Sequence, residues 1–123
     1  MLFERSHGPT FSIRSEPLDH GVCLHVTGEM DLATVPALDS QLSALRTAFM
    51  PVILDLSEVT FFDSTGLRSM VRATRAARLR PCKFLISQPS DAVMRVVDIA
   101  GLRDLLPLLE TETPAEQSGR GPV

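Results

Sequence analysis

The stretch VILDLSEVTFFDSTGLRSMV, residues 52–71, decides the fold of this chain. Its first part, residues 52–57, alternates between apolar and polar side chains and predicts a β-strand, and the apolar run ends at Phe62. After Ser64, apolar residues recur at helical spacing. Between strand and helix lies Asp63-Ser64-Thr65-Gly66. Such residues commonly cap helices, but the same position suits a chemically modified serine, and both interpretations of Ser64 stay open on these residues alone.

Composition points to one cytoplasmic domain. The chain has 123 residues, 44% of them hydrophobic, which is enough for a single buried core. Its formal net charge of −3 argues against nucleic acid as a partner. No apolar run approaches the roughly 20 residues of a membrane span, and the first ten residues lack the apolar core of a signal peptide. Two cysteines, Cys23 and Cys82, are too few for a disulfide scaffold and fall on opposite faces of their predicted strands.

Strands and helices alternate along most of the chain. The pattern predicts strands over residues 10–17, 22–28, 52–57, 82–87 and 105–109, and helices over residues 34–50, 64–80 and 90–102. This order indicates βαβ units with right-handed crossovers. We therefore expect a flexible N-terminus over residues 1–10, one domain over residues 11–110 and a disordered polar tail over residues 111–123.

Side-chain alternation predicts which face of the sheet the helices cover. Val22, Leu24 and Val26 point to one face, while the residues between them point to the other. The two later strands show the same division into an apolar and a mixed face. Because successive right-handed crossovers place helices on one side, the predicted fold is a mixed, mostly parallel α/β sheet of four to five strands with helices packed mainly on one face.

Ser64 is the first candidate functional residue. The free N–H groups and partial positive charge at a helix N-terminus favour a phosphoryl group there. Phe61 and Phe62 are expected to hold the turn rigidly, and Gly66 removes a side chain so that a partner's backbone can come close. Ser64 is thus well placed at the surface to be phosphorylated.

An enzyme is the least favoured class. A nucleophilic serine needs a base, and the three histidines lie in the N-terminus (His7), a turn (His20) and mid-strand (His25). The pattern G-x-S-x-G is absent. His25 is expected to be a half-exposed strand residue, no metal site is predicted, and no cofactor is indicated.

Three segments resemble the STAS domain, in particular the free-standing anti-sigma-factor antagonists of bacteria. They are VTGEMD (26–31), VILDLSEVTFFDSTGL (52–67) and VMRVVDIAGL (93–102), and the resemblance runs from about Phe11 to Glu110. D-S-[ST]-G-L at a strand-to-helix junction is the specific motif. The resemblance implies a STAS fold and phosphorylation of Ser64 by an anti-sigma factor that is itself a serine kinase with bound ATP or ADP.

The same resemblance implies a regulatory cycle. The unphosphorylated protein would bind the anti-sigma factor and free a sigma factor, as in stress response or sporulation, and a PP2C-type serine phosphatase would remove the phosphate. The protein would be a monomer or weak dimer. The expected partner-binding residues are Glu29, Asp31, Asp63, Ser64, Thr65, Gly66, Leu67, Arg68, Ser90 and Asp91.

Several of these residues also have a purely structural interpretation. Asp31 and Ser90-Asp91 precede predicted helices and can simply cap them, and Arg68 can belong to a solvated helix face. Two other functions stay open. The chain can be a STAS-type scaffold or adaptor subunit in a sensory or lipid-transport complex without a phosphorylation cycle. A nucleotide-binding module is less favoured, because neither a Walker-type loop nor G-x-G-x-x-G occurs.

Overall fold

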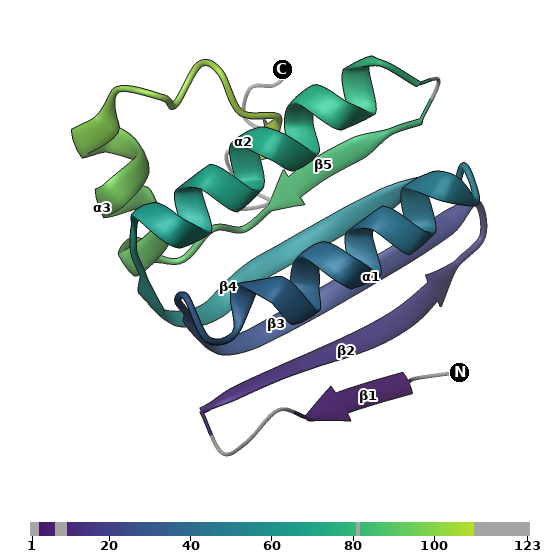
Figure 1. Cartoon of the computed structure of the whole chain (residues 1–123), viewed down its shortest axis with the longest axis horizontal. Helices are drawn as coiled ribbons and strands as arrows, with labels where there is room; N and C mark the ends of the chain where they lie inside the picture. The colour runs from purple at the N-terminus through teal and green to yellow at the C-terminus, as the bar shows by residue number, and fades with distance from the viewer. Residues whose placement is uncertain (1–2, 7–9, 81, 110–123) are drawn as a thin grey trace, which may run out of the picture.

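The computed structural model describes residues 3–6, 10–80 and 82–109 (Figure 1). Its elements are β1 (Phe3–Ser6), β2 (Phe11–Leu18), β3 (Gly21–Met30), α1 (Val35–Thr47), β4 (Val52–Phe62), α2 (Ser64–Arg78), β5 (Phe84–Ser87), α3 (Asp91–Ala100) and β6 (Leu108–Leu109). Over these ranges, none of the helices has the length and apolar character needed to cross a membrane.

The described strands form one sheet in chain order, β1-β2-β3-β4-β5-β6. The pairs β1–β2 and β2–β3 are antiparallel, and the other three pairs are parallel. This confirms the mixed, mostly parallel α/β class. The described sheet has six strands instead of four to five because residues 3–6, expected to be flexible, pair with β2. That pairing gives partners to backbone groups of β2 that would otherwise lie at an open edge. The expected tail over residues 111–123 lies outside the described residues.

The helices of the described chain pack on one face of the sheet. Figure 1 shows α1 and α2 side by side over the sheet, roughly along its strands. Leu38 of α1, Met70 of α2 and Val97 of α3 all belong to one core with the inward side chains of the strands. Leu24 and Leu54, on the two central strands, are 0% exposed. The predicted one-sided covering is confirmed.

Strand β4 is longer than its alternation predicts. It runs on to Phe62 because its register with β3 shifts twice, between His25 and Thr27 and between Gly28 and Glu29. Gly28 lies in the middle of this irregular region with a φ of +104°, and a Cβ there would lie 1.8 Å from the carbonyl oxygen of Thr10. Only glycine tolerates that conformation and that approach. The result is that β3 and β4 end together, with Met30 paired to Phe62.

Candidate functional site

The start of α2 shows which residue caps the helix. Asp63 has an extended backbone, and its Oδ1 accepts hydrogen bonds from the N–H groups of Thr65 at 2.9 Å and Gly66 at 3.3 Å. Asp63 is therefore the N-cap, and Ser64 is the first helical residue. Ser64 is exposed, and its hydroxyl makes no hydrogen bond within the described part of the chain. The hydroxyl is thus free for chemistry or contact.

Gly66 serves internal packing. It is buried, and a Cβ built on it would lie 2.7 Å from Cε1 of the Phe62 ring, which is itself only 5% exposed. The absence of a side chain therefore lets the first turn of α2 lie against that ring. This corrects the expectation that Gly66 makes room for another molecule's backbone, because the space it leaves is already occupied.

Asp31 organises the loop between β3 and α1. Its Oδ1 accepts hydrogen bonds from the N–H groups of Ala33 at 3.0 Å and Thr34 at 3.1 Å. The Thr34 hydroxyl donates to the carbonyl oxygen of Glu29 at 2.7 Å and accepts from the N–H of Asp31 at 2.9 Å. The Asp31 side chain therefore closes the turn before α1, whose N-cap position is Thr34, while its Oδ2 makes no hydrogen bond to the described residues.

Because of the sheet register, acidic residues lie at the same end of the sheet as the start of α2. Met30 pairs with Phe62, so Asp31 and Asp63 each come one residue after a paired position. Glu29 pairs with Phe61 one step earlier. Because β3 and β4 are parallel neighbours, these strand ends lie at one edge of the sheet, on the left of Figure 1.

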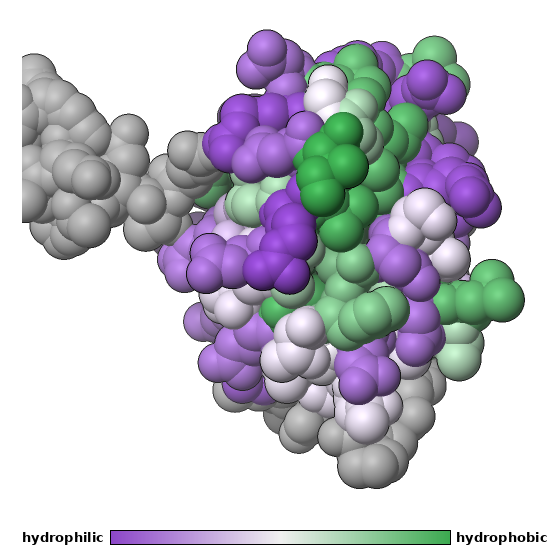
Figure 2. Space-filling view, turned by 90° about the vertical axis from the view of Figure 1, so that its left-hand side faces the viewer, coloured by the Kyte–Doolittle hydropathy of each residue, from purple (hydrophilic) through white to green (hydrophobic). Residues whose placement is uncertain are grey.

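Exposed apolar side chains also belong to this edge. Phe61 is 47% exposed and Leu32, in the loop after β3, is 77% exposed. Figure 2 faces this edge and shows hydrophobic surface running between hydrophilic groups. The expectation that both phenylalanines anchor the turn is wrong for Phe61, since alternation turns it away from the core. Leu32 was not among the expected site residues, although an apolar residue in a polar turn is a signal that could have found it.

The other expected residues have diverse positions. Thr65 and Leu67 are half-buried, and Leu67 packs against the core. Arg68 is exposed and pairs with no described residue, in contrast to Arg72, which binds Asp39 of α1 at 2.7 Å.

Ser90 and Asp91 lie at the start of α3. The Ser90 hydroxyl donates to the carbonyl oxygen of Val59 at 2.7 Å and accepts from the N–H of Val93 at 3.3 Å. Ser90 therefore links the start of α3 to β4 by a hydrogen bond. Asp91 is exposed, whereas Ser90 is half-buried.

Comparison with known proteins identifies the family. The sequence model of the STAS-domain family matches residues 12–115 of this chain. The chain belongs to the STAS-domain family. This STAS-domain protein is 31% identical to the anti-sigma-B factor antagonist of Listeria monocytogenes, over 84% of the chain and 90% of that relative.

Solved structures agree with the fold of this STAS domain. An anti-sigma factor antagonist from Mycobacterium paratuberculosis superposes with a TM-score of 0.74 at 28% identity, covering 92% of this chain and 97% of the other. SpoIIAA of Bacillus, solved in its phosphorylated form, superposes with a TM-score of 0.64 over 89% of this chain and 98% of its own. At 19% identity the second likeness concerns the fold alone.

The face of the STAS sheet away from the helices carries a hydrogen-bonded cluster of side chains. His25 of β3 bridges two carboxylates, with Nδ1 2.7 Å from Oδ2 of Asp55 and Nε2 2.7 Å from Oε1 of Glu16. The backbone N–H of Ser57 donates to the other oxygen of Asp55 at 2.9 Å. Burial alone would raise the pKa of Asp55, but the hydrogen bonds from Ser57 and His25 outweigh it and lower that pKa below its ordinary value of 3.8.

This lowered pKa predicts how stability responds to acid. The ionised Asp55 contributes stability that is fully present above the unfolded pKa of 3.8 and is lost as the pH falls through the lower folded pKa. Asp55→Asn has no carboxyl group to protonate at this position. We therefore expect the variant's free energy of unfolding, measured with urea, to fall less steeply than that of the wild type from about pH 5 downward. Asp19→Asn, in the exposed turn after β2, is the control. Equal slopes for Asp55→Asn and the wild type would contradict the assignment.

Proposed function

We propose that this protein is an anti-sigma-factor antagonist that is switched by phosphorylation of Ser64. In the unphosphorylated state it binds an anti-sigma factor, which is also a serine kinase with bound ATP or ADP, and thereby frees a sigma factor. The observation that carries the proposal is the exposed Ser64 hydroxyl, which has no hydrogen-bond partner among the described residues because Asp63 caps α2. The name of the Listeria relative supports an anti-sigma factor as the partner.

The local chemistry favours Ser64 over its neighbours as the phosphorylated residue. Thr65 is half-buried, and the hydroxyl of Ser90 is engaged with Val59. A phosphoryl group on Ser64 would meet the positive end of the α2 dipole, which stabilises the modified residue within its own helix. A PP2C-type phosphatase would reverse the modification, since an exposed phosphoserine is accessible to a second enzyme.

The surroundings of Ser64 suit a docking surface for another protein. Phe61 and Leu32 supply apolar area, and Asp31 and Asp63 supply a polar, acidic rim. Mixed surfaces of this kind are typical of non-obligate interfaces. A phosphate of about −1.5 to −2 charges placed among those carboxylates would repel a partner that fits the neutral serine. The switch needs no change of fold.

Incubation with the cognate kinase and ATP tests the phosphorylation site. We expect one phosphate per chain, located at Ser64 by mass spectrometry, and no labelling of Ser64→Ala. Ser40→Ala, on the exposed side of α1, and Thr65→Ala are the controls and should be labelled like the wild type. Undiminished labelling of Ser64→Ala would refute the site. Binding of the partner without any labelling would favour a scaffold or adaptor instead.

A further inference from the structure

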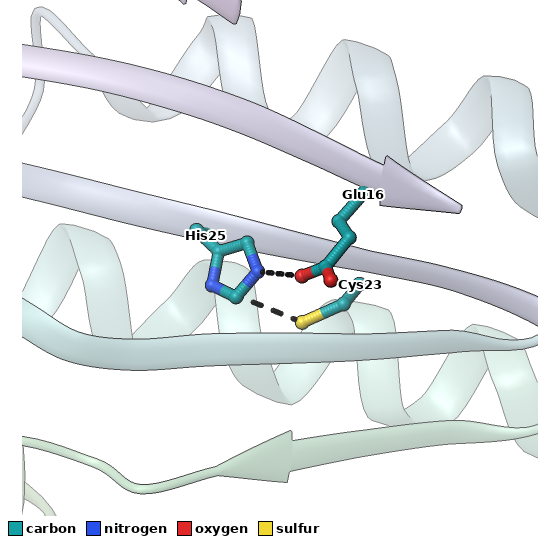
Figure 3. Close-up of side chains that lie close together, drawn as sticks. All are labelled: Glu16, Cys23 and His25. Carbon is teal, nitrogen blue, oxygen red and sulfur yellow. Dashed lines mark hydrogen bonds and ion pairs between the residues drawn. The ribbon is translucent and has the colours of Figure 1, made fainter. Parts of the chain in front are cut away.

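The uncovered face of the sheet brings three potential metal ligands together. Cys23 and His25 are two residues apart on β3 and so point to the same face, and Glu16 on β2 is the direct cross-strand partner of Cys23. Figure 3 shows the three side chains directed toward one another. Their ligand atoms, one from each residue, all lie within 4.8 Å of each other.

We propose that Glu16, Cys23 and His25 form a binding site for Zn²⁺. Zinc accepts a mixed set of sulfur, nitrogen and oxygen ligands in tetrahedral geometry, and with bonds of about 2.0–2.3 Å its ligand atoms lie some 3–4 Å apart. The ligand atoms of the three residues lie within 4.8 Å of one another, which is close to that range. Glu16 Oε1, now 2.7 Å from His25 Nε2, must move back slightly, and its half-exposed side chain has room to do so. Water would fill the fourth position.

Asp55 acts as a positioning residue for this site. It contacts Nδ1 of His25 at 2.7 Å and is held in turn by the N–H of Ser57. A carboxylate on one imidazole nitrogen fixes the ring and directs the other nitrogen to the metal, which is the arrangement around many zinc-bound histidines. The ligand nitrogen is then Nε2, beside Glu16.

The charges around the site suit a divalent cation. Glu16 and Asp55 place two carboxylates beside His25, and Arg14 is the cross-strand partner of His25. Burial first, and then the negative charges of Asp55 and Glu16, raise the pKa of the Cys23 thiol to about 11. Binding replaces the S–H bond of Cys23 with a Zn–S bond and releases that proton to water, while Nε2 of His25 binds the metal through its lone pair.

Titration of the full chain with Co²⁺, followed by competition with Zn²⁺, tests the site. We expect a thiolate-to-cobalt absorption band in the wild type that Zn²⁺ abolishes. The band should be lost in Cys23→Ser and retained in Cys82→Ser, because Cys82 lies beside Leu42 on the helix-covered side. Asp55→Asn should lower the affinity for the metal by about 10- to 100-fold, because it removes the residue that positions a ligand. Glu16→Gln should lower that affinity further.

A measurement on the wild type keeps the test independent of any variant's folding. Bound Zn²⁺ should slow alkylation of Cys23 by iodoacetamide, measured by mass spectrometry, and leave alkylation of Cys82 unchanged. Equal rates at Cys23 with and without Zn²⁺, or a cobalt band that Cys82→Ser removes, would overturn the proposal. The site is on the opposite face of the sheet from α2, so these results do not depend on the role of Ser64.

Discussion

Phosphorylation of Ser64 is expected to weaken binding of the anti-sigma factor by about a thousandfold or more. That loss corresponds to about 4 kcal/mol. A phosphoserine would bury close to two negative charges against Asp31 and Asp63 at the interface, and an uncompensated buried charge costs several kcal/mol. The unmodified hydroxyl carries no such penalty, since it is exposed and uncharged.

Titration of fluorescently labelled antagonist with the anti-sigma factor measures this loss. Ser64→Asp should bind more weakly than the wild type, and Ser64→Ala should bind about equally and resist inactivation by ATP. Ser40→Asp adds the same charge on an exposed position of α1 and should leave the affinity unchanged. If Ser64→Asp and Ser40→Asp bound alike, the electrostatic switch would be wrong, although the protein could still bind the same partner.

Replacement of Phe62 by alanine is expected to lower the free energy of unfolding by about 3–5 kcal/mol, the usual cost of deleting a buried aromatic ring. Phe62 is 5% exposed and lies directly under Gly66, so its ring supports the first turn of α2. The resulting cavity would loosen the turn that presents Ser64. We therefore expect weaker partner binding as well as lower stability.

Phe61→Ala is the matched control for this substitution. Phe61 is the same residue type one position earlier but 47% exposed, so its loss should cost less than about 1 kcal/mol of stability. Urea unfolding of both variants, followed by circular dichroism, gives the comparison. Similar losses for the two variants would mean that the ring of Phe62 does not support α2. A drop in partner affinity for stable Phe61→Ala would place Phe61 in the docking surface.

Local rules in the sequence predicted much of the fold. Helix α3 begins at Asp91, directly after its cap residue Ser90. It ends at Ala100, before Gly101 with a positive φ of 73°, as glycine after a periodic segment indicates. Residues of α2 follow the expected boundaries closely, from Ser64 to Arg78. Such signals act within a few residues of themselves, which is why they can be read without knowledge of the rest of the chain.

Features of the fold that depend on distant segments were predicted less well. The end of β4 was placed five residues early, because its continuation to Phe62 depends on register shifts against β3. No strand was predicted over residues 3–6, which pair with β2 in the sheet. In both cases the deciding partner is another strand.

For this STAS-domain protein, the order of strands and helices, the one-sided covering of the sheet and the position of Ser64 at a helix start all followed from the sequence, because periodicity and capping are local. Which phenylalanine is buried, why Gly66 has no side chain, and how Glu16 comes to face Cys23 and His25 were decided by tertiary structure alone. These features depend on which residues of separate segments stand opposite each other, and strand register and close packing set that only once the whole sheet has formed.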